Sequence, residues 1–200
     1  MPVYKESFAS VIRPTLESLQ AAVSTYELQG GSANIFVNDD GLQIIPEDEA
    51  MARRDYYSEH GIGWVARPPH DPKGRSGDGS PFVRRGKFKK ASNMNFALHI
   101  SNRVEDILFR VRRGRRWTQV LESAAYDRAL ADVLAQDEGR TLADGNIRVG
   151  DYILLVDADT RVPDDCIIEA VSEMEQSPDV AILQFKSGVI HVTDSFFERR

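Results

Sequence analysis

The chain alternates between short apolar runs and longer amphipathic stretches. Strands are predicted for five short apolar runs: residues 2–6, 33–37, 62–66, 152–156 and 180–185. Helices are predicted where apolar residues recur at helical spacing: from Pro14 to the Gln29–Ser32 turn, and over 47–59, 90–112, 117–137 and 163–176. Because strands alternate with helices, we expect an α/β fold with a doubly wound, mostly parallel sheet.

The predicted strand 152–156 ends in two carboxylates, Asp157 and Asp159. Ligands of open α/β sheets bind at the carboxyl ends of the strands. Neighbouring carboxylates repel each other unless one is protonated or a cation lies between them, and Mg²⁺ or Mn²⁺ also holds phosphates. The pair therefore predicts a metal site for a phosphorylated ligand, with capping of the following helix as the alternative.

Acidic residues also follow two other predicted strands. Glu6 follows the first strand and Asp39 the second. If these strands are parallel to the strand before Asp157, all three carboxylates lie at one edge of the sheet. This arrangement predicts a ligand site, but many nucleotide-binding folds share it and it names no reaction.

The composition is that of an ordinary soluble domain, with 42% hydrophobic and 28% charged residues in 200. No run of eighteen apolar residues and no signal-peptide pattern is present, so no membrane span is expected. The single Cys166 excludes an internal disulfide framework, fits a reducing compartment and falls in an apolar helical pattern, which predicts a buried structural thiol. The four histidines show no metal-ligand spacing.

The net charge of −6 hides a strong asymmetry. Residues 67–116 carry fourteen Lys and Arg against four Asp and Glu, so the remainder is strongly acidic. A basic block indicates an anionic ligand or surface, such as nucleotide phosphates, nucleic acid or a membrane, while a merely solvated basic face is the alternative.

Four segments occur in a characteristic order over about 160 residues: Pro2–Glu6, Asn38–Gly41, Gly86–Leu98 and Val156–Asp159. The series resembles the processive family 2 glycosyltransferases, the cellulose, chitin and hyaluronan synthase group, and is most similar to their fungal-type relatives. The resemblance implies a GT-A (Rossmann-like) fold and a hexosyltransferase that uses a nucleotide-sugar donor, usually a UDP-sugar, with Mn²⁺ or Mg²⁺. It also implies inverting transfer to a glycan acceptor.

The resemblance places the nucleoside end of the donor near the first two strands. Tyr4 and Glu6 match the opening strand motif that lines the base pocket. Asp39 would contact the uracil, and Asp40 would support it near the ribose. A uracil N–H is a donor that a carboxylate can accept.

The diphosphate and sugar would lie near the later segments. Lys90 and Asn95 belong to the family segment beside the diphosphate. Asp157 would face the sugar and ribose, and Asp159 would ligate the metal that bridges the phosphates. A diphosphate leaving group needs its growing charge neutralised, which a metal and a lysine before a helix start supply.

Not every polar residue of the basic segment needs a function. Lys87 and Lys89 are interpreted as solvated loop charge. Asn95 can equally be an ordinary buried polar group in a helix.

Two family segments are missing after Asp159. The family's general base lies in a T-E-D-type segment, and a Q-x-x-R-W segment binds the acceptor; the flanking transmembrane helices are absent as well. The Arg112–Trp117 segment also ends in R-W, but it precedes Asp157 and lacks the Gln, so it is interpreted as a basic turn between two helices. We therefore expect residues 1–200 to be the donor-binding part of a larger enzyme at the cytoplasmic face of a membrane, binding donor but transferring little sugar alone.

Three alternatives stay open. A catalytically inactive module would bind a nucleotide-sugar or a partner without transferring sugar. A haloacid-dehalogenase-type phosphatase shares D-x-D but needs Thr or Val four residues after the first Asp, where this chain has Arg161. Nucleic-acid binding through 84–116 lacks the interleaved aromatic residues that usually accompany it, so no nucleic-acid partner is expected.

Overall fold

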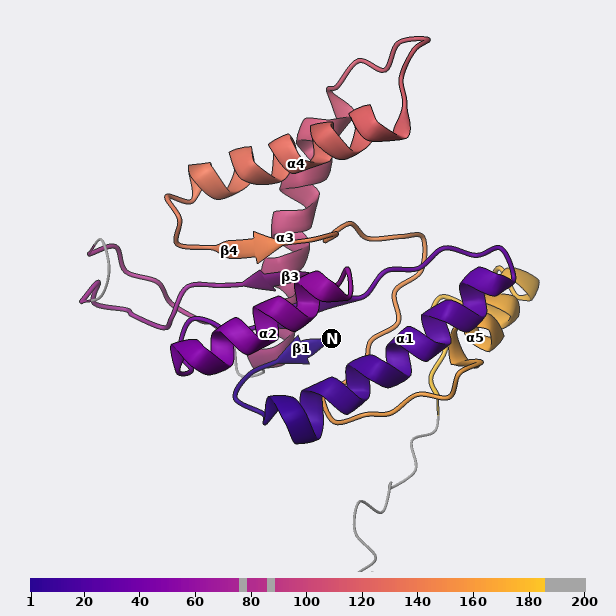
Figure 1. Cartoon of the computed structure of the whole chain (residues 1–200), viewed down its shortest axis with the longest axis horizontal. Helices are drawn as coiled ribbons and strands as arrows, with labels where there is room; N and C mark the ends of the chain where they lie inside the picture. Colours follow the sequence, from indigo (N-terminus) through magenta and orange to yellow (C-terminus); the bar gives the residue numbers. More distant parts are fainter. Residues whose placement is uncertain (76–78, 86–88, 186–200) are drawn as a thin grey trace, which may run out of the picture.

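The computed structural model of the chain describes residues 1–75, 79–85 and 89–185. Lys87 lies outside these residues. Strands and helices follow one another along the chain as labelled in Figure 1. They are β1 (Pro2–Val3), a π-helical turn (Phe8–Ile12), α1 (Arg13–Leu28), β2 (Phe36–Asp39), α2 (Glu47–Glu59), β3 (Gly63–Ala66), α3 (Lys89–Phe109), α4 (Gln119–Gln136), β4 (Leu142–Asp144) and α5 (Cys166–Gln176).

The sheet of the described residues is mostly parallel. Its strands lie in the order β1-β2-β3-β4, with β1, β2 and β3 parallel and β4 antiparallel to β3. Val3 pairs with Asp39 and Asn38 pairs with Val65, so the carboxyl ends of the first three strands meet at one edge. The predicted α/β class is confirmed, and the arrangement is consistent with a GT-A (Rossmann-like) fold.

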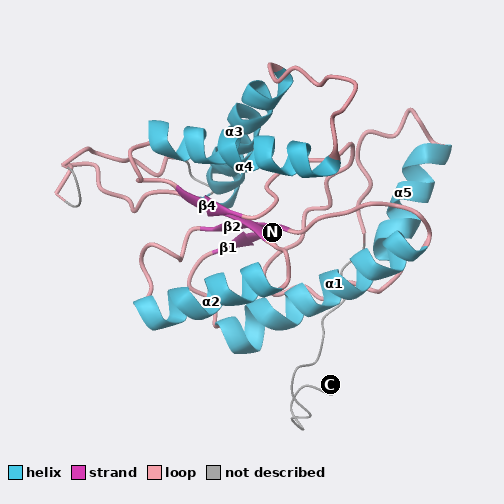
Figure 2. Ribbon diagram, turned by 45° about the horizontal axis from the view of Figure 1, so that its top comes forward, coloured by secondary structure: helices cyan, strands magenta, loops and turns pink. Residues whose placement is uncertain are grey.

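Helices cover both faces of the sheet, as Figure 2 shows. One core cluster joins α1 and α2 to the sheet through residues such as Leu16, Tyr57 and Trp64. A second cluster joins α3 and α4 to the opposite face through residues such as Ile100 and Val133. The predicted double winding therefore follows from apolar stripes on four helices that meet the sheet from two sides.

Local signals in the sequence place the helix ends. Pro14 lies in the first turn of α1, where its missing N–H needs no partner. Glu47, Asp48 and Glu49 fill the first turn of α2, where negative charge is favoured by the helix dipole. Thr118 caps α4 by accepting a hydrogen bond from the Leu121 N–H.

The predicted strand over 152–156 is wrong. Residues 152–155 are irregular and exposed, and at Val156 the chain enters the core beside α1. A strand there would extend the sheet next to β1, but β1 has two residues, and Pro2 has no N–H to donate. The run therefore lacks the partner that a strand requires.

The predicted strand over 180–185 is also wrong. This segment is irregular, and Ile182 is 85% exposed. No described strand pairs with this segment, and an extended run without a pairing neighbour forms no strand.

Other predictions need smaller corrections. β2 begins at Phe36 rather than residue 33 and includes Asp39, which the sequence pattern had placed after the strand. The antiparallel strand β4 was not predicted, because three residues carry too little periodicity to be recognised. Cys166 is buried as predicted, and burial raises the pKa of its thiol.

The Arg112–Trp117 segment is a turn between α3 and α4, as predicted. Arg113 donates two hydrogen bonds of 2.8 Å to the Glu122 carboxylate, and the Trp117 indole N–H donates a third to it. None of the helices within the described residues is long and apolar enough to cross a membrane.

Candidate functional site

The carboxyl edge of the parallel strands gathers four of the eight predicted site residues. Tyr4 and Glu6 follow β1, Asp39 and Asp40 stand at the end of β2, and Arg67 follows β3. Because the strands are parallel and in register, these residues lie along one edge although they are far apart in the chain.

The Asp39 carboxylate is buried and fully engaged, with none of the residue exposed. It accepts hydrogen bonds from Arg53 Nη1 at 3.2 Å, from the Tyr57 hydroxyl at 3.0 Å and from the Gly41 N–H at 2.8 Å. Burial raises the pKa of Asp39, while Arg53, Gly41 and Tyr57 each act to lower it. In this arrangement Asp39 holds the end of β2, and no oxygen of its carboxylate faces solvent.

Arg53 joins Asp39 to the segment after β1. Besides the carboxylate, its guanidinium donates to the Tyr4 carbonyl at 3.1 Å, the Glu6 carbonyl at 2.8 Å and the Glu49 carboxylate at 2.9 Å. Gly41 is required beside this contact, since a Cβ there would lie 1.9 Å from the Tyr4 carbonyl oxygen. The backbones carrying Tyr4, Glu6 and Asp39 are therefore fixed relative to one another.

Sequence reasoning missed Arg53, although a signal was present. Ala50, Arg53 and Tyr57 recur at i, i+3 and i+7 and form the buried face of α2. A charged residue in such a stripe indicates a buried partner, because unpaired charges are rarely buried. Asp39, carried on the neighbouring strand, is that partner.

Asp40 is held by two arginines that the sequence analysis did not identify. Arg67 makes a bidentate contact, with Nε and Nη2 each 2.7 Å from a carboxylate oxygen, and Arg84 Nη1 lies 3.8 Å away. Arg67 also donates to the Ser92 hydroxyl at 2.8 Å and to the Lys89 carbonyl at 3.3 Å, which ties this group to the start of α3. Two guanidiniums beside one carboxylate leave an excess positive charge near the start of α3, which favours an anion.

Lys90 and Asp157 lie together, although 67 residues separate them in the chain. Lys90 Nζ is 2.8 Å from Asp157 Oδ1, and both side chains are more than half exposed. The hydrogen bond to Asp157 raises the pKa of Lys90, and the charges of Asp159 and Glu6 act in the same direction. Lys90 and Asp157 are therefore in contact where a ligand can reach them, and Asp159 and Glu6 act on Lys90 through their charges. We call these four residues the acidic cluster.

Asn95 is exposed on α3, and no described residue forms a hydrogen bond with its side chain. The buried amide of this helix is Asn93, whose Nδ2 donates to the Asn38 carbonyl at 2.7 Å. Asn93 thus fixes α3 to β2. Sequence reasoning missed this role because Asn93 and Asn95 are the same residue type and lie two positions apart in one helix.

Tyr4 is 43% exposed, and its ring lies 5.6 Å from the Lys5 ammonium.

A divalent ion would find oxygen ligands at Asp157 and Asp159. No group of three His, Cys, Asp or Glu side chains within the described residues is placed to hold a metal alone. Mg²⁺ sites in phosphate-binding proteins, however, commonly use one or two carboxylates and complete their shell with waters and phosphate oxygens. Two exposed carboxylates in the cluster with Lys90 fit that second kind of site.

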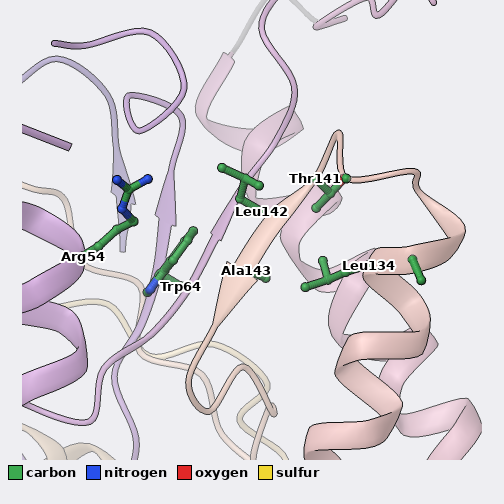
Figure 3. Close-up of a pocket in the computed structure, with 8 residues that line it drawn as sticks. Arg54, Trp64, Leu134, Thr141, Leu142 and Ala143 are labelled. Atoms are coloured by element: carbon green, nitrogen blue, oxygen red, sulfur yellow. The ribbon is translucent and has the colours of Figure 1, made fainter. Parts of the chain in front are cut away.

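A hollow of the described structure lies elsewhere. Figure 3 shows it on the side of β3 and β4, and its volume is about 420 Å³. Its lining includes Trp64, Leu134 and Leu142, with Arg54 at one side, and none of the predicted site residues. The acidic cluster is instead an open surface.

A family model described as glycosyl transferase family group 2 matches residues 152–200. The matched part is about a quarter of the chain and contains Asp157 and Asp159, while its residues 186–200 lie outside the described structure. The match supports a family 2 glycosyltransferase-like domain and a transferase activity. Neither curated proteins nor solved structures gave a match to the chain.

Proposed function

We propose that the chain binds a nucleotide-sugar, of the UDP-sugar type, together with Mn²⁺ or Mg²⁺, for inverting sugar transfer in polysaccharide or glycan synthesis. The observation that carries this proposal is the exposed ion pair of Lys90 and Asp157, with Asp159 and Glu6 acting on Lys90 through their charges. The family match over residues 152–200 supports glycosyl transfer as the type of reaction.

The diphosphate would lie between Lys90 and the two aspartates. Lys90 supplies a cation on a flexible stem, and the phosphates would displace Asp157 from it. A divalent ion held by Asp157 and Asp159 would neutralise charge on the leaving diphosphate. The excess positive charge of Arg67 and Arg84 adds to the attraction for the anion.

The nucleoside would extend toward Tyr4, whose exposed ring offers a surface for the base. In the proposed complex Asp39 contacts the uracil and Asp40 supports the ribose side. Because Tyr57 and Arg53 cover the Asp39 carboxylate, this contact requires one of them to move. Asn95 would contact the donor from the exposed surface of α3.

The acceptor in this proposal is a glycan, and the parent enzyme acts at the cytoplasmic face of a membrane in the manner of the polysaccharide synthases. The second candidate is a module that binds the donor without transferring sugar.

The first experiment is thermal unfolding of the chain with UDP, with and without Mn²⁺. A ligand present at 100 times its dissociation constant stabilises the native state by about 2.7 kcal/mol. For a chain of this size we expect the unfolding temperature to rise by roughly 5–10 °C. Asp157→Ala/Asp159→Ala should abolish the rise, whereas Asp164→Ala/Asp165→Ala, which removes two exposed acids a few residues away, should retain it.

Two results contradict the proposal. One is a cooperatively folded wild type with no response to UDP and Mn²⁺. The other is a response that the Asp157/Asp159 variant retains. If binding is confirmed, release of UDP from a UDP-sugar with and without a glycan acceptor distinguishes the transferase from the inactive module.

A further inference from the structure

The connection between α3 and α4 carries large apolar side chains in solvent. We define the α3–α4 tip as residues 109–122, which rise away from the sheet at the top of Figures 1 and 2. Phe109 is 90% exposed, Val120 77% and Leu121 45%. An aromatic and two aliphatic side chains grouped at a projecting end indicate an interaction surface rather than scattered surface residues.

The same tip is strongly basic. Arg110, Arg112, Arg115 and Arg116 are exposed, and none of their side chains forms an ion pair or hydrogen bond with a described residue. Glu122, the acidic residue of the tip, pairs with Arg113 and with Arg148. Four arginines without an ion partner among the described residues therefore lie in the same short segment as the three apolar side chains, in a chain whose net charge is −6.

The tip is also held in a defined shape. The Arg113 guanidinium donates to the Glu122 carboxylate and to the Leu108 carbonyl, and the Trp117 indole donates to the same carboxylate. These bonds join the end of α3 to the beginning of α4. The exposed apolar and basic side chains of the tip therefore lie on or beside a turn that side-chain hydrogen bonds hold in shape.

We propose that the α3–α4 tip binds the surface of a bilayer that contains anionic lipids. The arginines would contact lipid phosphates, and Phe109, Val120 and Leu121 would enter the interface between headgroups and acyl chains. A projecting tip with apolar side chains suits a flat, deformable surface. Single-stranded nucleic acid favours a series of free aromatic rings on which successive bases stack. The tip offers one such ring, Phe109, because the Arg113 guanidinium lies over the Trp117 ring at 5.7 Å.

This inference goes beyond the proposed function and is independent of it. Lys90 lies near the first residue of α3 and Phe109 is the last, so a helix of about 30 Å separates the acidic cluster from the tip. Changes at the tip should therefore leave the response to UDP and Mn²⁺ unaltered, and failure of either proposal is distinguishable from failure of the other.

The test is co-sedimentation of the chain with phosphatidylcholine vesicles that contain or lack phosphatidylserine. We expect binding only to the anionic vesicles, decreasing with added salt. Each arginine near an anionic surface changes the partition coefficient about fivefold, so Arg115→Glu/Arg116→Glu should lower it by about 30-fold or more. Phe109→Ser should lower it by about tenfold through loss of the inserted ring.

Matched controls lie outside the tip. Arg75→Glu/Arg128→Glu makes the same change in net charge at two other exposed arginines, and Leu28→Ser removes an exposed leucine at the end of α1. Both should bind anionic vesicles within about twofold of the wild type. If the charge-reversal variant fails to unfold cooperatively, Arg115→Gln/Arg116→Gln replaces it in the comparison.

Three results would overturn the proposal. They are a folded wild type that does not bind phosphatidylserine vesicles, control variants that lose binding as much as the tip variants, and tip-dependent binding of RNA without binding of vesicles. The last result would assign the tip to nucleic acid.

Discussion

The buried ion pair between Arg53 and Asp39 gives the sharpest quantitative prediction. Both side chains are fully buried, and Nη1 lies 3.2 Å from Asp39 Oδ2. Replacing Arg53 with Met leaves a carboxylate in the core without its cation and removes donors from the Tyr4 and Glu6 carbonyls. Breaking a buried pair by removing one partner costs about 3–5 kcal/mol. For a chain of this size, the unfolding temperature should fall by roughly 10 °C.

The neighbouring arginine provides a control. Arg54 pairs with Glu47 on the same helix, but these side chains are 30% and 71% exposed. An exposed pair contributes at most about 1 kcal/mol, so Arg54→Met should be nearly neutral. Urea unfolding monitored by circular dichroism compares the two variants directly.

The pH dependence tests the electrostatic part of the argument. Without Arg53, burial raises the pKa of Asp39 further. A carboxyl whose pKa is raised on folding favours the folded state at low pH and loses that contribution as the pH rises through the folded-state value. Because the unfolded state is common to both proteins, the stability difference between Arg53→Met and the wild type should grow as the pH rises above the raised folded-state pKa of Asp39 in the wild type. In Asp39→Asn/Arg53→Met, which removes both charges of this pair, that pH dependence should disappear.

Equal losses for Arg53→Met and Arg54→Met would refute this reasoning. So would an Arg53→Met loss that stays constant with pH. Either outcome would mean that the Asp39 carboxylate does not depend on Arg53 in the folded protein.

Three further predictions concern other parts of the chain. Lys90→Met should weaken UDP binding about tenfold in calorimetry, because a charge-assisted contact is lost. The control Lys89→Met should leave the affinity for UDP unchanged, and neither variant should alter stability by more than about 1 kcal/mol. Hydrogen bonds from Arg113 and Trp117 lower the pKa of Glu122 to about 2. The contribution of Glu122 to stability is therefore present above its unfolded pKa of about 4.5 and is lost as the pH falls toward 2. Acid unfolding of Glu122→Gln should lack that component, and a pH profile identical to that of the wild type would contradict this reasoning. Cys166 should react slowly with a thiol reagent in the native protein and rapidly in denaturant, and equal rates would show that the thiol is accessible.

Much of the fold could be predicted from local patterns. The bounds of α2 agree with the apolar spacing over 47–59, and α3 and α4 begin close to the predicted residues. These elements carry their own signals, in side-chain periodicity and in the residues at their ends, so they do not depend on distant parts of the chain. The convergence of Glu6 and Asp39 at one sheet edge likewise follows once the strands are taken as parallel.

The two wrong strands show the limit of such reasoning. An apolar run such as 152–156 specifies a preference for burial, but a strand also needs a neighbour whose backbone is free and long enough to pair. β1 is too short to serve as that neighbour, which the run itself does not reveal.

The site divides in the same way between sequence and tertiary structure. Local sequence pointed to the candidate residues: paired acids after an apolar run, a lysine at a helix start, and a balance of charge that favours an anion. Which of them lie together and which are covered follows from tertiary packing, which brings Lys90 to Asp157 and buries Asp39 under Arg53 and Tyr57. Contacts between residues far apart in the chain depend on how the helices and strands pack. The sequence around a residue does not encode which distant residue it will contact.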